Sequence, residues 1–127
     1  MVATIKLRVV DLYHGDRVSS FKKAADFGIW GIIHKATTGA TGSDGKYSVR
    51  RSAAVDAGLL WGAYHWGTNA NVSKQVDNFV KKAKPDDKTL IALDYEDPRM
   101  SLSQAREFLM LLAEKSEENQ FSTAETS

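Results

Sequence analysis

Four short apolar segments alternate with four helical segments along this chain of 127 residues, and this order constrains the fold more than any other feature. The expected strands cover residues 7–12, 29–35 and 59–66, and the fourth lies within residues 89–98 and includes residues 92–96. The expected helices cover residues 20–26, 47–57, 71–83 and 101–114. Strand–helix units of about 20–30 residues imply parallel strands that are joined by right-handed crossovers. The sequence therefore predicts an α/β fold with a parallel sheet.

Helix caps and apolar stripes support the expected helices. Ser101 with Gln104 matches a capping box, and Gly28 and Gly58 are expected to end the first and second helices. Residues 37–45 contain too much glycine for regular structure. The last two helices each have one apolar face, made of Val72, Val76, Phe79, Val80 and Ala83 in the third helix and of Leu102, Ala105, Phe108, Leu109 and Leu112 in the fourth.

The stretch of residues 89–98, expected to hold the fourth strand, begins apolar and ends in three acids within four positions before Pro98. Residues two apart in a strand point to the same face, so Asp94 and Glu96 share one side. Ligands bind at the carboxyl ends of strands in α/β sheets and barrels. Two neighbouring carboxyls cannot both ionise freely, so one should keep its proton to higher pH. This is the acid/base pair that glycoside hydrolysis needs; the alternative is a solvated acidic turn.

Polar or aromatic side chains also mark the ends of the other three strands: Asp11 and Tyr13, Lys35, and Tyr64. Four strands that supply such groups at one end of a sheet favour an active site over a solvated turn. Trp66 ends the third strand and could line a sugar groove, because flat aromatic faces suit sugar rings. Trp30 and Trp61 are instead expected in the core.

Composition excludes other classes of protein. Seventeen Lys and Arg residues against 16 Asp and Glu leave a formal charge of +1, so no charge excess points to nucleic acid or to an anionic membrane. The chain has no cysteine, which excludes disulfides and thiol nucleophiles. We see no signal peptide and no run near the about 20 apolar residues of a membrane helix. We therefore expect a chain that is cytoplasmic as synthesised.

Neither a nucleotide site nor a metal site is predicted. The glycines of residues 37–45 lack the spacing of phosphate-binding and dinucleotide-binding loops. The three histidines lie on different elements without ligand spacing: His14, His34 and His65. No metal and no cofactor is expected, although these histidines with Asp11 and Asp94 leave a metal site as an alternative.

Five groups of residues between about Val9 and Glu96 carry a resemblance to a known family. They are Val10-Asp11, Ile32-Ile33-His34-Lys35-Ala36-Thr37 with Gly39, Ala54 with Ala57-Gly58-Leu59, Gly62-Ala63-Tyr64-His65-Trp66 and Leu93-Asp94-Tyr95-Glu96. In these motifs the chain resembles the glycoside hydrolase family 25 muramidases, lysozymes that cut peptidoglycan. The last two motifs are the specific ones, since they are similar to the family's Tyr-His-aromatic and Asp-x-Glu signatures.

The resemblance implies a β/α barrel of the TIM type whose mouth cleaves the β-1,4 bond between N-acetylmuramic acid and N-acetylglucosamine. It implies that Glu96 is the general acid, with the raised pKa that such a group needs, and that Asp94 orients or stabilises, for example through the substrate's acetamido group. Asp11 matches the family's first-strand aspartate, and Tyr64 would contact the sugar. Further substrate-binding candidates are Trp66, Lys35 and Tyr13.

The same resemblance implies a peptidoglycan glycan strand as the partner, with no nucleic acid and no membrane. The chain would act on the cell wall after release or export. A β/α barrel needs about 200 residues or more. With about four β/α units, we expect a truncated, incomplete barrel over residues 1–115 and a polar, disordered tail over residues 116–127. A homodimer could cover the open barrel edges.

The chain also departs from the family within the matched region. Thr38 stands where the family's second-strand motif continues with Glu, and the family's Asn in the second helix is replaced around Arg50-Arg51. Two other hypotheses therefore remain. One is a non-catalytic remnant that binds cell-wall glycan or a partner. The other is an unrelated α/β domain with an accidental match.

Overall fold

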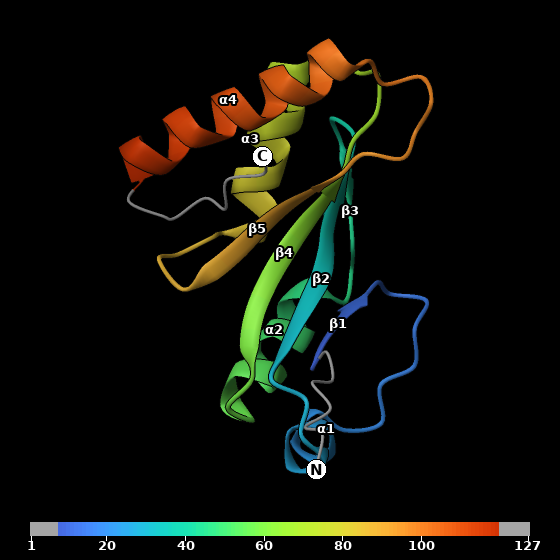
Figure 1. Ribbon diagram of the computed structural model, residues 1–127, viewed down its shortest axis with the longest axis vertical. Helices are drawn as coiled ribbons and strands as arrows, with labels where there is room; N and C mark the ends of the chain where they lie inside the picture. Colours follow the sequence, from blue (N-terminus) through green and yellow to red (C-terminus); the bar gives the residue numbers. More distant parts are fainter. Residues whose placement is uncertain (1–7, 120–127) are drawn as a thin grey trace, which may run out of the picture.

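The computed structural model describes residues 8–119, and it contains the four expected strand–helix units in order (Figure 1). The elements are β1 (Val9–Leu12), α1 (Phe21–Phe27), β2 (Gly31–Thr38), β3 (Gly42–Ser43), α2 (Tyr47–Asp56), β4 (Leu60–Trp66), α3 (Val72–Ala83), β5 (Thr89–Asp94) and α4 (Leu102–Asn119). The start of the first expected strand, residue 7, lies outside the described residues.

The four longer strands form a parallel sheet in the order β1-β2-β4-β5. Each parallel connection carries a helix, as right-handed β/α units require. Within residues 8–119 the outer strands β1 and β5 do not pair with each other, so the barrel is not closed there. The predicted fold class, a parallel β/α structure of about four units that is an incomplete barrel, is therefore confirmed.

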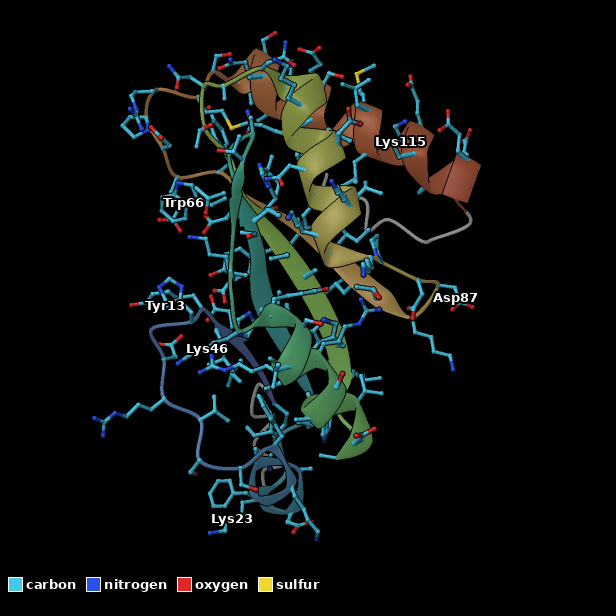
Figure 2. All side chains as sticks on the ribbon, turned by 180° about the vertical axis from the view of Figure 1, so that it is seen from behind. Tyr13, Lys23, Lys46, Trp66, Asp87 and Lys115 are labelled. Atoms are coloured by element: carbon cyan, nitrogen blue, oxygen red, sulfur yellow. The ribbon has the colours of Figure 1, made fainter. Side chains whose placement is uncertain are left out.

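One face of the sheet is covered by helices and holds the core. Tyr47 of α2 contacts Trp61 on β4. Four residues further along β4, on the same face, the ring of His65 contacts Phe79 of α3 and Phe108 of α4. Figure 2 looks onto this side, with α2 and α3 in front of the strands. Alternate side chains of each strand therefore point into the helix layer.

The opposite face of the sheet, turned to the viewer in Figure 1, has no helix on it within the described residues. Leu60 of β4 is 70% exposed there and lies beside Gly31 of β2 in the strand register. Successive side chains of a strand point in turn to this open face and to the helix-covered face. The carboxyl ends of the strands on the open face are where the sequence predicts a site.

The helix ends follow the signals in the sequence. The hydroxyl of Ser20 accepts a hydrogen bond from a first-turn amide of α1, and Gly28 ends that helix in the left-handed region, at φ 112°. Asn71 caps α3 in the same way. At α4 the Ser101 hydroxyl accepts from the Gln104 amide at 3.1 Å, and the Gln104 side chain accepts from the Ser101 amide at 2.9 Å. The predicted capping box is therefore present.

Replacing Ser101 with Ala is expected to lower the free energy of unfolding by about 1 kcal/mol. The backbone N–H of Gln104 would lose its acceptor at the start of a long helix. Urea denaturation measures the change, and the matched control is Ser103→Ala, at an exposed position two residues on. Equal losses in the two variants would contradict a capping role for Ser101.

Two expectations about the middle of the chain are wrong. β2 runs on to Thr38, and Gly42–Ser43 form β3, which pairs antiparallel with it, so residues 37–45 are partly regular. The side-chain amide of Asn78 on α3 donates to the carbonyls of Gly39 and Gly42 at 3.1 and 3.0 Å, and this tertiary contact fixes the hairpin. Trp30 is 65% exposed rather than core, because it precedes β2 at the end of the sheet.

The last helix also differs from the expectation. Leu102 is exposed, because contact with the core begins one turn later, at Ala105. α4 continues to Asn119, past the expected helix end at Glu114 and past the expected domain boundary at residue 115. The rest of the expected tail, residues 120–127, lies outside the described residues. None of the helices within the described part of the chain is long and apolar enough to cross a membrane.

Candidate active site

A hollow of about 270 Å³ lies on the open face of the sheet, toward the carboxyl ends of its strands. Its lining comes from β1, β2, β4, β5 and the turn after β5, namely Asp11, Ile33, Tyr64, Ala92, Leu93, Asp94 and Glu96. The strand register explains this grouping, since Asp11 pairs with Ile33 and Tyr64 pairs with Ala92. The structure therefore brings together four residues that the sequence predicts for the site: Asp11, Tyr64, Asp94 and Glu96.

The carboxyl of Asp94 in this hollow has a raised pKa. Burial raises the pKa of Asp94 to about 6, and the neighbouring carboxyls of Glu96 and Asp11 act in the same direction, while Lys35 lowers it. Asp94 is half-buried, whereas Glu96 is exposed. Because the two groups interact, the proton belongs to the pair rather than to one residue. One carboxyl of the pair thus holds its proton to higher pH, as the spacing indicates; the raised pKa expected of Glu96 stays a prediction.

The raised pKa of Asp94 predicts how stability depends on pH. The ordinary value of 3.8 applies to the unfolded chain, so between about 4 and about 6 the folded chain binds more protons than the unfolded chain. Stability from this group therefore falls as the pH rises through that window, and the loss is complete above it. Asp94→Asn lacks this titrating group and therefore lacks this loss. We expect the difference in melting temperature, Asp94→Asn minus the unchanged chain, to increase as the pH rises across the same window.

Thermal unfolding of both proteins between about pH 4 and about pH 7 measures this difference. The control is Asp77→Asn, an exposed position on α3 that is remote in sequence from the hollow. A difference between Asp94→Asn and the unchanged chain that does not vary with pH would contradict the account.

Tyr64 can act as a hydrogen-bond donor throughout the pH range in which proteins function. Burial, with the negative charges of Asp94 and Asp11 next in size, raises the pKa of Tyr64 to about 12. Its hydroxyl therefore keeps its proton. Its sensitivity to both aspartates also shows that the three side chains share one electrostatic environment.

The other three predicted site residues do not line the hollow. Lys35 lies beside Tyr64 in the register of β2 and β4, and its ammonium is 5.3 Å from the ring centroid of Trp66. Trp66 in turn pairs with Asp94 of β5. Tyr13 is exposed on the loop after β1, edge-on to His14, and Figure 2 shows its side chain on the same side of the molecule as Trp66. Lys35 and Trp66 are thus adjacent to the acids, and Tyr13 is more peripheral.

A buried hydrogen-bond network supports the end of β4, and the sequence analysis does not predict it. The Thr37 hydroxyl donates to Nδ1 of His65 at 2.6 Å, and Nε2 donates to the side-chain carbonyl of Gln75 at 2.9 Å. The Gln75 amide donates to the backbone carbonyls of Thr68 and Ala70. Burial lowers the pKa of His65 to about 4, so the ring is neutral at physiological pH. His65 therefore orders the loop after Trp66 rather than transferring protons.

A second network orders the loop after β1. Arg50, buried on α2, donates from Nη1 to the carbonyl of Tyr13 at 3.0 Å and from Nη2 to the carbonyl of Asp16 at 2.7 Å. It also donates to Nε2 of His34 at 3.1 Å. This arginine occupies the region where the chain departs from the family pattern. No local sequence signal indicates the contact, because it joins residues more than 30 positions apart.

The alternative of a metal site gains no support from the described residues. Among residues 8–119, no group of three His, Cys, Asp or Glu side chains is arranged to hold a metal ion. The histidines have separate partners, since His14 pairs with Asp44, His34 accepts from Arg50, and His65 bonds to Gln75.

Comparisons with known proteins agree on one family. The model of glycosyl hydrolases family 25 matches residues 10–125. No curated protein matches the chain by sequence. The chain is similar to the solved structure of a bacterial lysozyme from Streptomyces coelicolor, with a TM-score of 0.76 and 25% identity over 91% of this chain and 59% of that one.

Two further solved structures share the fold. A muramidase from Acremonium alcalophilum has a TM-score of 0.74 and 22% identity over 83% of this chain and 59% of that one. The CTP1L endolysin has a TM-score of 0.71 and 23% identity over 89% of this chain and 41% of that one. The chain thus spans about three-fifths of the length of the first two structures.

Proposed function

Because this chain belongs to glycosyl hydrolase family 25, we propose that it is a peptidoglycan hydrolase, a muramidase that cleaves the β-1,4 bond between N-acetylmuramic acid and N-acetylglucosamine. The observation that carries the proposal is the hollow at the strand ends, where Asp94 and Glu96 meet Asp11 and Tyr64. A pair of neighbouring carboxyls, of which Asp94 has a raised pKa, is the kind of machinery that glycoside hydrolysis uses.

In the proposed reaction Glu96 delivers the proton to the leaving glycosidic oxygen. Glu96 is exposed just beyond the end of β5, where a glycan strand lying across the hollow can reach it. Asp94 sits deeper beside Glu96, so a proton can pass between the two carboxyls. Once ionised, Asp94 stabilises the positive charge that develops on the sugar, or orients the acetamido group that does so.

The remaining residues bind and orient the sugar. The protonated hydroxyl of Tyr64 donates a hydrogen bond near the reacting carbon, and Asp11 accepts one from the sugar on the opposite side of the hollow. Trp66 offers an aromatic face next to Asp94, and Tyr13 extends the surface along the loop after β1. Action on the cell wall after release or export, and a homodimer that covers the open strand edges, stay predictions.

The experiment that tests this function is digestion of purified peptidoglycan, followed through the appearance of new reducing ends. The expected result is release in proportion to the amount of folded protein. No release from folded protein would reject the proposed hydrolase.

A second candidate function is glycan binding without turnover. It is favoured by the open sheet within residues 8–119, because displacements of about 1 Å are enough to lose catalytic geometry. Sedimentation with the same insoluble peptidoglycan separates the two functions. Binding without release of reducing ends supports this second function, and release supports the first.

A further inference from the structure

Lys35 is the last residue of β2 before a β-bulge, and regular alternation places its side chain on the open face. Lys35 pairs with Tyr64, but Thr37 pairs with His65, the very next residue of β4, so Ala36 is an extra residue in β2. A bulge of this kind re-aims the side chains on either side of it. Ala36 and Thr37 both lie buried under the helices as a result, while Lys35 stays on the open face. The carbonyl of the extra residue is satisfied by the backbone N–H of Asp44 at 2.9 Å.

An aromatic ring, rather than an acid, holds the ammonium of Lys35. Its Nζ lies 5.3 Å from the ring centroid of Trp66, within the range of a cation–π contact. None of the ion pairs between described residues includes Lys35. Trp66 pairs with Asp94 across β4 and β5, so the ring keeps the charge next to the acids without neutralising one of them directly.

The groups that face Asp94 come from all four parallel strands. They are the carboxyl of Asp11 on β1, the ammonium of Lys35 on β2, the hydroxyl of Tyr64 on β4 and the carboxyl of Glu96 after β5. Together with Asp94 itself, this set contains three carboxyls, and Lys35 is its cation. Its side chain is half-buried, so water screens its charge less than that of a surface lysine.

We propose that Lys35 is a positioning residue for the acid pair and not a sugar contact: held over the Trp66 ring on the open face, its ammonium is the cation that balances the negative charge of the carboxyls around Asp94. The role of Lys35 in catalysis rests on the proposed function, whereas its effect on the protonation of Asp94 does not. Without the ammonium, three carboxyls repel one another with no cation between them, and the pair keeps its proton to a higher pH.

The test compares Lys35→Met, which removes the charge at similar length, with Lys35→Arg, which keeps a cation over the ring. Carbon-13 NMR follows the side-chain carboxyl of Asp94 through a pH titration, and Asp94→Asn identifies its signal. We expect the Asp94 midpoint to rise by about one pH unit in Lys35→Met and to return toward the original value in Lys35→Arg. Lys23→Met is the control, on the exposed surface of α1 (Figure 2).

The outcome separates this inference from the proposed function. An unchanged Asp94 midpoint in folded Lys35→Met overturns the inference, whether or not the chain releases sugar. In the reducing-end assay, the pH–rate profile of Lys35→Met should move toward higher pH by the same amount, with the KM unchanged. A raised KM with an unmoved profile would make Lys35 a sugar contact and would likewise overturn it. If no variant releases reducing ends, the hydrolase proposal fails, and the titration still decides the role of Lys35.

Discussion

The Glu96→Gln variant is expected to release new reducing ends from peptidoglycan about 10²–10⁴ times more slowly than the unchanged chain, because an amide cannot supply the proton that the leaving oxygen needs. The substitution keeps the size and shape of the side chain. Glu96 is exposed and follows the last residue of β5, so the fold should not depend on its charge. The loss should therefore appear in kcat, while binding to insoluble peptidoglycan persists.

The matched control for this prediction is Glu107→Gln, the same chemical change at an exposed position of α4 outside the hollow. Its rate should equal that of the unchanged chain. If Glu96→Gln were as active as Glu107→Gln, the leaving oxygen would take its proton from another group, and the role given to Glu96 would be wrong. Asp94→Asn should also lose activity, since it removes the other half of the coupled pair.

The second large effect is on stability, at the ring that joins α4 to the sheet. Phe108 is 0% exposed, stacks on the ring of His65 at 4.8 Å between centroids and meets the edge of Phe79 at 6.3 Å. Phe108→Ala removes these contacts and leaves a cavity, so we expect it to lower the free energy of unfolding by about 3–5 kcal/mol. This is a large share of the total of about 5–15 kcal/mol that is typical of a small domain.

Chemical denaturation measures the loss, and Phe27→Ala provides the control. Phe27 is 84% exposed at the end of α1, so its truncation should change the free energy of unfolding by less than about 0.5 kcal/mol. Similar midpoints for the two variants would show that α4 does not contribute to the core. Because Phe108 covers His65, the variant should also loosen the loop that the Gln75 network holds.

The sequence predicts which side chains gather at this hollow because that grouping depends on local rules. Parallel strands place their carboxyl ends at one edge of a sheet, and alternation places Asp94 on the open face at the end of β5. The sequence predicts Glu96 on the same strand, whereas in the structure it lies in the turn after β5 and still lines the hollow. These two rules were enough to bring Asp11 and Tyr64 to the same hollow from strands far apart in the sequence. Helix ends were predictable for a similar reason, since a cap such as that of Ser101 involves residues three positions apart.

The features that the sequence does not reveal depend on contacts between distant elements. The exposure of Trp30 follows from its place just before β2, at the end of the sheet, and no property of the residue itself indicates it. The hairpin of β3 needs Asn78 from α3, and the loop after β1 needs Arg50 from α2. The bulge at Ala36 changes the face of Thr37 through its pairing with β4, whereas strict alternation places Thr37 on the open face with Lys35.

The measurement that tests the central claim most directly is the identity of the sugar at the newly formed reducing ends. Peptidoglycan fragments that the chain releases are reduced with borohydride, hydrolysed and analysed for the reduced sugar. A muramidase leaves N-acetylmuramic acid at the reducing end, so the account predicts reduced muramic acid and no reduced glucosamine above the undigested control. Reduced glucosamine instead, or no new ends from protein that is folded and binds the wall, would contradict it.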